Sequence, residues 1–129
     1  MSTPSLPPTH RLHPGYGHEL LRSWQSGPGL DPARLMYPMF IVDDPDARQE
    51  IGAMPGQYRW GVNRLAEALD QAVADGLRSV LLFGVPDEGK DARASTADDD
   101  DSGVATALRK LRELYPDLFL ATDVCLCAY

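Results

Sequence analysis

From residue 35 onward, apolar segments of strand length alternate with segments of helical periodicity, and this alternation restricts the fold more than any other feature. Residues 35–42, 79–85 and 118–126 are mostly apolar, and the second run is typical of a strand buried on both faces. Between the runs, apolar residues recur at steps of three and four, which indicates one buried helical face. Those residues are Val62, Leu65, Leu69 and Val73 in the first segment and Val104, Leu108, Leu111 and Tyr115 in the second. The order predicts an α/β fold with a parallel sheet and right-handed crossovers.

The ends of the two predicted helices carry their own signals. Gly76 stands where a glycine commonly ends a helix, and either Asp101 or Ser102 can cap the second helix. Pro116 ends that helix, because proline lacks the backbone N–H that a helix interior needs. Residues 43–56 contain two prolines and are predicted to form a turn-rich loop.

The first 34 residues differ in character from the rest, since they hold six of the eleven prolines. Proline fixes φ and removes a donor, so this stretch cannot form one long regular element. Leu20, Leu21 and Trp24 nevertheless fit one face of a short helix. We expect a tail without fixed structure over residues 1–12. We expect residues 13–34 to form an arm that lies on another surface, such as a second subunit.

Charge and composition exclude several classes of function. The net charge of −7 argues against a general binder of nucleic acid or of anionic membranes, because both need a basic face. Much of this charge lies in residues 87–101, which end in four aspartates and predict a solvated loop. A calcium loop would need alternating ligands and a turn glycine. No apolar run is long enough to span a membrane and no signal sequence opens the chain, so we expect a cytoplasmic protein.

The carboxyl ends of the predicted strands are where chemistry is expected, because parallel α/β folds bind ligands there. Alternate residues of a strand share a face, so the acidic residue and both thiols that end the third strand are predicted to point the same way. The residues at the three strand ends are Asp43 and Asp44, then Gly84, Val85 and Pro86, then Asp123, Cys125 and Cys127.

The spacing of Cys125 and Cys127 leaves two interpretations open. Small buried cysteines are common core residues. Alternatively, the two thiolates belong to a zinc site, because zinc accepts soft anionic sulfur ligands. Two ligands do not complete such a site, and the three histidines lie in the arm, where they are poorly placed to supply a third. They are His10, His13 and His18. A disulfide between the two cysteines is disfavoured by ring strain and by a reducing compartment.

The residues alone supply no complete catalytic constellation. Lys90 and Lys110 are the only lysines, and both are predicted to be exposed, whereas a Schiff-base lysine needs desolvation. Neither standard glycine-rich phosphate loop is present.

Seven blocks of sequence, in order between His13 and Tyr129, resemble a known family. The blocks are residues 13–16, 20–24, 37–42, 54–56, 61–65, 76–86 and 122–127. They resemble the amino-terminal part of the zinc-type porphobilinogen synthases, also called delta-aminolevulinic acid dehydratases. The resemblance implies condensation of two 5-aminolevulinate molecules to porphobilinogen, a lyase reaction of haem biosynthesis. It also implies a TIM barrel preceded by an arm that wraps a neighbouring subunit, so that the complete enzyme is a homo-oligomer.

The resemblance assigns roles to three residues. Cys125 and Cys127 match the first two of three cysteine ligands to zinc, and Asp123 matches an acidic residue beside that metal, a possible active-site acid. The third cysteine and the two active-site lysines of the family, one of which forms a Schiff base, are expected beyond Tyr129. No catalytic lysine of the family is therefore expected within the chain.

These implications set the expected organisation. We expect residues 1–34 to be an arm with a short helix, and residues 35–129 to be the first three strands and two helices of a TIM (β/α)8 barrel. A complete barrel takes about 250 residues, so we expect an incomplete barrel, a fragment that is inactive alone. One alternative is a non-catalytic interaction module that docks on or perturbs full-length subunits. Another is a self-sufficient, flavodoxin-like α/β domain, which needs more than three strands.

Overall fold

The computed structural model describes residues 17–27, 29–86, 90–97, 99–126 and 128, and the chain divides into two compact units. The first unit is Met1–Leu30 and the second is Asp31–Tyr129. In the first unit, helix α1 (Glu19–Trp24) occupies the stretch where a short helix is expected. The His18 side chain caps it by accepting a hydrogen bond from the Leu20 N–H at 3.2 Å.

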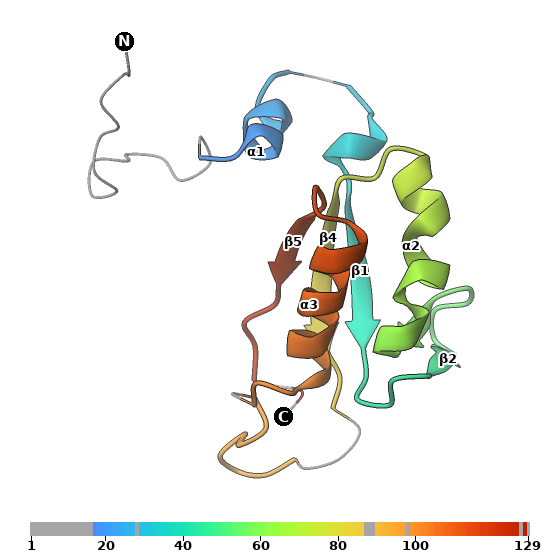
Figure 1. Ribbon diagram of the computed structural model, residues 1–129, viewed down its shortest axis with the longest axis vertical. Helices are drawn as coiled ribbons and strands as arrows, with labels where there is room; N and C mark the ends of the chain where they lie inside the picture. Colours follow the sequence, from blue (N-terminus) through green and yellow to red (C-terminus); the bar gives the residue numbers. More distant parts are fainter. Residues whose placement is uncertain (1–16, 28, 87–89, 98, 127, 129) are drawn as a thin grey trace. The chain divides into compact units, whose positions relative to one another are not determined.

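The second unit is built on a five-stranded sheet in the order β2-β3-β1-β4-β5 (Figure 1). The strands are β1 (Met36–Ile41), β2 (Arg48–Glu50), β3 (Tyr58–Trp60), β4 (Ser79–Gly84) and β5 (Phe119–Thr122). Strand β1 pairs in parallel with β3 and β4, and β4 pairs in parallel with β5. Only β2 runs antiparallel, against β3. The predicted α/β fold is confirmed, and β1, β4 and β5 are parallel as expected, but the hairpin makes the sheet mixed.

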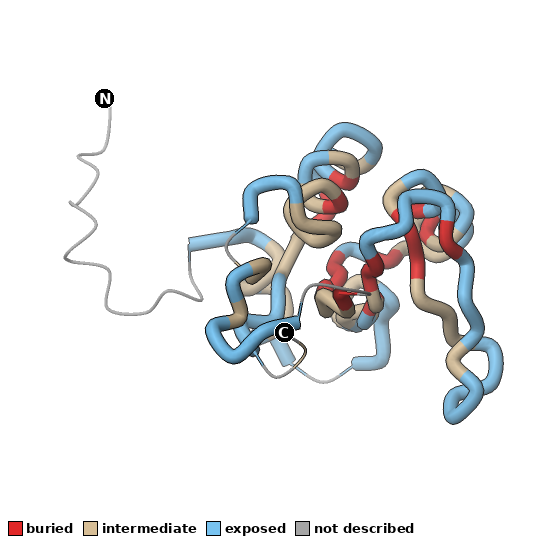
Figure 2. The backbone as a smooth tube through the Cα atoms, turned by 90° about the horizontal axis from the view of Figure 1, so that it is seen from below, coloured by how far each residue is buried: buried red, intermediate tan, exposed pale blue. Residues whose placement is uncertain are grey.

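Two helices cover one face of this sheet, and the core lies beneath them (Figures 1 and 2). Helix α2 (Leu65–Ala74) follows a 3-10 turn at Val62–Arg64, and helix α3 (Gly103–Leu114) precedes β5. The buried core residues come from α2, α3 and the helix-facing side of β1 and β4. They include Leu65, Leu69, Ala107, Leu111, Met39, Ile41, Val80 and Leu82. No helix in the described part of the chain is both long and apolar enough to cross a bilayer.

The predicted helix ends are present and have local causes. Gly76 has a φ of +105°, its N–H donates to Val73 O, and the Leu77 N–H donates to Ala72 O. This is the glycine-dependent motif that closes a helix by satisfying its last carbonyls. Of the two candidate caps for α3, Ser102 is the one used, since its side chain accepts from the Ala105 N–H at 3.3 Å.

Three local expectations are wrong. Residues 43–56 were expected to be only a turn-rich loop, but β2 lies within them and pairs with β3 as a hairpin. The third apolar run, residues 118–126, is a strand only over Phe119–Thr122. The run at residues 79–85 is not buried on both faces, because Leu81 and Phe83, on the side away from the helices, are only partly buried. An apolar run predicts a strand, but it does not show whether helices pack on one face of that strand or on both.

Helices α2 and α3 are joined by one hydrogen bond, from the Tyr115 hydroxyl to Asp70 Oδ1 at 2.5 Å. Tyr115→Phe is expected to lower the free energy of unfolding by about 1 kcal/mol, because the carboxylate loses this donor. Burial, together with the hydrogen bond to Asp70 and the negative charge of Asp70, raises the pKa of Tyr115 to about 12. The stabilising contribution is therefore complete below pH 10, the ordinary tyrosine pKa, and is lost as the pH rises toward 12.

Urea denaturation of the parent chain and of Tyr115→Phe at two pH values measures both effects. Below pH 10 the variant should be the less stable of the two. Above pH 10 the difference in the free energy of unfolding between the two chains should become smaller, because only the parent has a phenol at position 115 that can lose its proton on unfolding. Equal midpoints at neutral pH would show that the hydrogen bond contributes nothing to stability.

Candidate functional site

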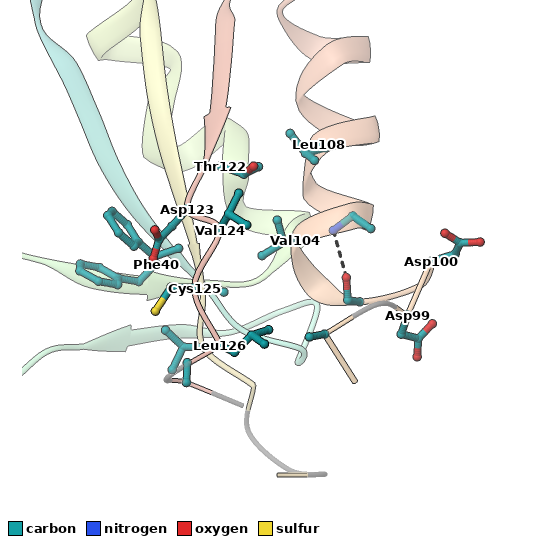
Figure 3. A pocket seen from close by; sticks show the side chains of 17 residues that line it. Phe40, Asp99, Asp100, Val104, Leu108, Thr122, Asp123, Val124, Cys125 and Leu126 are labelled. Carbon is teal, nitrogen blue, oxygen red and sulfur yellow. Dashed lines mark hydrogen bonds between the residues drawn. The ribbon is translucent and has the colours of Figure 1, made fainter. Parts of the chain in front are cut away.

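The three parallel strands β1, β4 and β5 end at one edge of the sheet, where a cavity of about 540 Å³ lies (Figure 3). One wall is Val104, Ala105 and Leu108 at the start of α3, and the opposite wall is the segment that follows β5. The sheet contributes two phenylalanine rings. This edge is the one at which the sequence places ligand binding.

Asp43 follows β1 and holds the start of α3 in place. Its Oδ1 accepts a hydrogen bond from the Gly103 N–H at 3.3 Å. A Cβ atom at Gly103 would lie 2.9 Å from the carbonyl oxygen of Val42 and 3.1 Å from Asp43 Oδ1. Glycine thus allows the first turn of α3 to approach the end of β1 closely. The Asp43 carboxylate stabilises the positive end of the helix, as an acidic side chain does at that position.

Asp44, the other acidic residue after β1, has a local structural role. Its Oδ1 accepts from the Asp46 N–H at 3.0 Å, and Asp46 Oδ1 accepts from Asn63 Nδ2 at 2.8 Å. These bonds fasten the turn after β1 to the turn before α2. Neither Asp43 nor Asp44 lines the cavity, so the sequence expectation that these two carboxylates belong to the ligand-binding site is not met there.

Asp123 and Cys125 both line the cavity, although β5 ends before them at Thr122. The Asp123 N–H still donates to the Leu82 carbonyl at 3.0 Å, so the parallel pairing extends one residue past the strand. Figure 3 shows Asp123 and Cys125 on the same side of this segment as Phe40, while Val124 points to the other side, toward Val104. Cys127, the second predicted thiol ligand, lies outside the described residues.

Most donor groups of this edge are open to solvent. Cys125 and Asp123 are both exposed. Within the described ranges, no three His, Cys, Asp or Glu side chains gather as a metal-binding group. Among the described residues, the cavity offers one thiol, Cys125, and three carboxylates, which are Asp99, Asp100 and Asp123.

The acidic loop is ordered by its own backbone where it is described. Asp91 Oδ1 accepts from the N–H groups of Arg93 at 2.8 Å and Ser95 at 3.1 Å. These hydrogen bonds, the one from the Ser95 backbone first, lower the pKa of Asp91. Lys90 is exposed in the loop, as predicted, whereas Lys110 is partly buried on the surface of α3, where it pairs with Glu113 at 3.5 Å.

Sequence reasoning missed the aromatic pair at the cavity. Phe40 and Phe83 stack with ring centroids 5.5 Å apart and an interplanar angle of 27°. They come from directly paired positions of β1 and β4 and lie on the sheet face away from the helices. Strand alternation could have placed each ring on that face, but only the register of β1 against β4 brings the two together.

Comparison with known proteins gives a consistent result. The family model described as Delta-aminolevulinic acid dehydratase matches residues 9–129. The chain is 50% identical to the Delta-aminolevulinic acid dehydratase of Bos taurus over 95% of its length, and 49% identical to that of Schizosaccharomyces pombe over 92%. It spans 38% and 36% of the lengths of these two curated relatives.

A solved structure shows the same likeness in three dimensions. Delta-aminolevulinic acid dehydratase (porphobilinogen synthase) from Toxoplasma gondii ME49, in complex with the reaction product porphobilinogen, superposes with a TM-score of 0.71. The sequences are 28% identical, and the match covers 87% of this chain and 32% of that one.

Proposed function

Because the chain belongs to the delta-aminolevulinic acid dehydratase family, we propose that it supplies an arm and the first βαβαβ part of a TIM barrel to a porphobilinogen synthase. This enzyme would condense two molecules of 5-aminolevulinate to porphobilinogen. The main support for this proposal is that the family model matches residues 9–129. In addition, Asp123 and Cys125 lie together at the cavity where β1, β4 and β5 end. We further propose that the protein acts in the cytoplasm and assembles as a homo-oligomer through the arm.

The barrel proposal is supported by the order of the elements. Strands β1, β4 and β5 are adjacent and parallel, and α2 and α3 connect them on one face. A barrel unit takes roughly 30 residues, and both units here are longer because the β2–β3 hairpin is inserted between β1 and α2 and the acidic loop lies between β4 and α3. In such barrels the catalytic groups stand at the carboxyl ends of the strands, where the cavity lies.

Asp123 is the proposed acid–base residue of this segment. Its carboxylate lines the cavity and is exposed, so it can exchange a proton with a bound substrate. The Asp123 N–H donates a hydrogen bond to the Leu82 carbonyl of β4, and this bond fixes the position of the Asp123 backbone at the cavity. Phe40 and Phe83 limit water on the sheet side of the cavity.

Cys125 and Cys127 are the proposed zinc ligands. Thiolate sulfur suits zinc, and the Cys125 side chain is exposed at the cavity that Asp123 also lines, so the donor chemistry at this position fits the ion. Bound zinc supplies Lewis-acid polarisation of substrate oxygen or nitrogen atoms. A third protein ligand would complete the site.

The function is tested by joining residues 1–129 to the following two thirds of the Bos taurus relative, which is 50% identical over the matched region. The joined protein should form porphobilinogen from 5-aminolevulinate when zinc is supplied. Asp123→Asn in this protein should lower kcat about 100-fold or more, because the amide cannot exchange the proton. A joined protein that folds, binds zinc and yet forms no porphobilinogen would overturn the proposal.

The chain by itself is expected to bind zinc only weakly, since two thiolates leave two coordination positions to water. Equilibrium dialysis measures the bound zinc, and cobalt(II) in its place reports sulfur ligation through its charge-transfer absorption. Cys125→Ser should remove this absorption. Asp100→Asn, at the same cavity but in the acidic loop, is the matched control and should leave it unchanged. Tight, stoichiometric zinc binding by the chain would contradict the two-ligand site.

A further inference from the structure

Strand β2 forms one outer edge of the sheet, where its only neighbour among the described strands is β3 (Figure 1). Its three residues, Arg48, Gln49 and Glu50, are all exposed. An open strand edge presents backbone N–H and C=O groups that can pair with a strand of another chain. The order of residues along β2 determines which kind of strand fits this edge.

The hydrogen bonds of the hairpin show which backbone groups of β2 point outward. The Ala47 carbonyl accepts a hydrogen bond at 2.9 Å and the Ile51 N–H donates one at 2.8 Å, both with residues that flank β3. Successive residues of an antiparallel strand alternate between facing the partner strand and facing away from it. Gln49 therefore faces β3, and the N–H and C=O groups of Arg48 and Glu50 point toward the open edge.

The charges along β2 make this edge complementary to itself. When two β2 strands pair in antiparallel fashion about a two-fold axis at Gln49, Arg48 of each copy lies opposite Glu50 of the other. These are the residues whose backbone groups point outward, so each such pair can exchange both of its backbone hydrogen bonds. A cation also faces an anion at each pair, and opposite charges directly across two strands are stabilising.

The other registers place like charges opposite each other. A two-fold axis at Arg48 would set the two arginines face to face, and an axis at Glu50 would do the same with the two glutamates. A parallel pairing in register would set each residue opposite its own copy, and like charges in that position are destabilising. Charges on a short edge strand commonly prevent pairing, but their order here favours one antiparallel register.

We propose that β2 is a dimerisation edge, on which a second copy of this chain docks by antiparallel β2–β2 pairing with Arg48 opposite Glu50. The pairing joins the sheets of the two copies into one continuous sheet. Arg48 pairs with Glu67 through Nε at 3.1 Å, so its terminal guanidinium nitrogens remain as donors for Glu50 of the second copy. The contact is small, so the dimer is weak and depends on concentration. This inference does not depend on the proposed function or on assembly through the arm.

The test is sedimentation velocity of the 129-residue chain over a range of concentrations that reaches millimolar. The parent chain should show a reversible equilibrium between monomer and dimer. Arg48→Glu alone and Glu50→Arg alone each place like charges opposite each other at both pairs, and each should weaken self-association about 10-fold or more. An equimolar mixture of the two variants should form a heterodimer about as tightly as the parent forms its dimer, because opposite charges then face each other again at both pairs.

Glu113→Arg is the matched control, since Glu113 is exposed on α3 and the substitution makes the same change of charge away from β2. It should self-associate as the parent does, and it should combine with Arg48→Glu more weakly than Glu50→Arg does. Circular dichroism of each variant reports whether the fold is kept.

Amide hydrogen exchange of the parent chain gives a second measurement that needs no variant, and it decides the matter if a charge reversal prevents folding. The Arg48 and Glu50 amides should become protected as the concentration rises, whereas the Gln49 amide, which faces β3, should be protected at every concentration. The proposal is overturned if the parent stays monomeric throughout, if the reversed variants self-associate as the parent does, or if the two folded variants do not combine. Unchanged exchange at Arg48 and Glu50 in a dimeric parent would also overturn it.

Discussion

Gly61→Ala is expected to destabilise the chain by about 3 kcal/mol or more, enough to abolish cooperative unfolding in a marginally stable unit. A Cβ atom at this buried position would lie 2.2 Å from the backbone oxygen of Asp44 and 2.4 Å from the carbonyl carbon and oxygen of Pro45. These are backbone atoms, so no side chain can rotate away. Gly61 has a φ of −82° and a ψ of 158°, a conformation open to any residue. Alanine at position 61 is therefore excluded by steric overlap with the backbone of Asp44 and Pro45, and not by the φ and ψ angles.

The backbone around Gly61 also connects the β2–β3 hairpin to α2. The Gly61 N–H donates to the Ala47 carbonyl at 2.9 Å, and the Asn63 N–H donates to the Pro45 carbonyl at 2.8 Å. Moving the turn to admit a methyl group would break these bonds, and the buried Gly61 N–H and Ala47 carbonyl would lose their partners. The predicted loss therefore combines overpacking with broken hydrogen bonds.

Thermal and urea unfolding followed by circular dichroism measure this effect. Gly52→Ala is the matched control, because a Cβ atom there meets nothing within 4 Å. It should change the free energy of unfolding by less than about 0.5 kcal/mol. A Gly61→Ala chain that unfolds at the same urea concentration as Gly52→Ala would show that the turn is far softer than its contacts imply.

Purified 129-residue chain is expected to form no porphobilinogen above the uncatalysed background. Resemblance to the family calls for an amine that forms a Schiff base with substrate, and the chain has only Lys90 and Lys110 to provide one. Lys90 is exposed, and Lys110 is 44% exposed on the outer surface of α3 and paired with Glu113. Neither is among the residues that line the cavity with Asp123.

This expectation is checked with the chain at high concentration, with and without zinc, by colorimetric detection of porphobilinogen. The joined protein in the same assay is the positive control. Borohydride reduction in the presence of 5-aminolevulinate, followed by mass spectrometry, should add no substrate mass to either lysine. Porphobilinogen formed by the chain, at a rate abolished by Lys90→Arg, would show that the loop lysine acts as the nucleophile.

The layered fold could be predicted because its causes are local. Leu65 and Leu69 in α2, and Leu111 in α3, are buried as their helical spacing predicts, and Gly76 and Ser102 mark helix ends by their own backbone and side-chain chemistry. The β2–β3 hairpin escaped prediction because its strands are three residues long and largely polar. Its stability comes from pairing with β1 and from packing of Tyr58 and Trp60 on each other and on Arg48.

The candidate site was predictable only in part, for a related reason. Asp123 and Cys125 lie just after β5, and the rule that parallel strands end at one edge places them at the cavity, whereas Asp43 follows β1 but does not line it. Which residues face one another across the strands depends on register, and a shift of one residue would exchange the faces. The meeting of Phe40 with Phe83 therefore became visible only in three dimensions.

The hairpin also governs how a barrel could close on β1. Strand β3 pairs only with the last part of β1, at Phe40 and Ile41. Along Met36–Met39, that side of β1 has no strand beside it in the described ranges. A further strand of a barrel could pair in parallel with β1 along Met36–Met39. Beyond Met39 that side of β1 is already taken by β3, so the further strand would run into the start of β3. In the proposed barrel, the hairpin would limit how far such a strand can shift along β1, and with it the stagger between the first and last strands on which the tilt and width of a closed barrel depend.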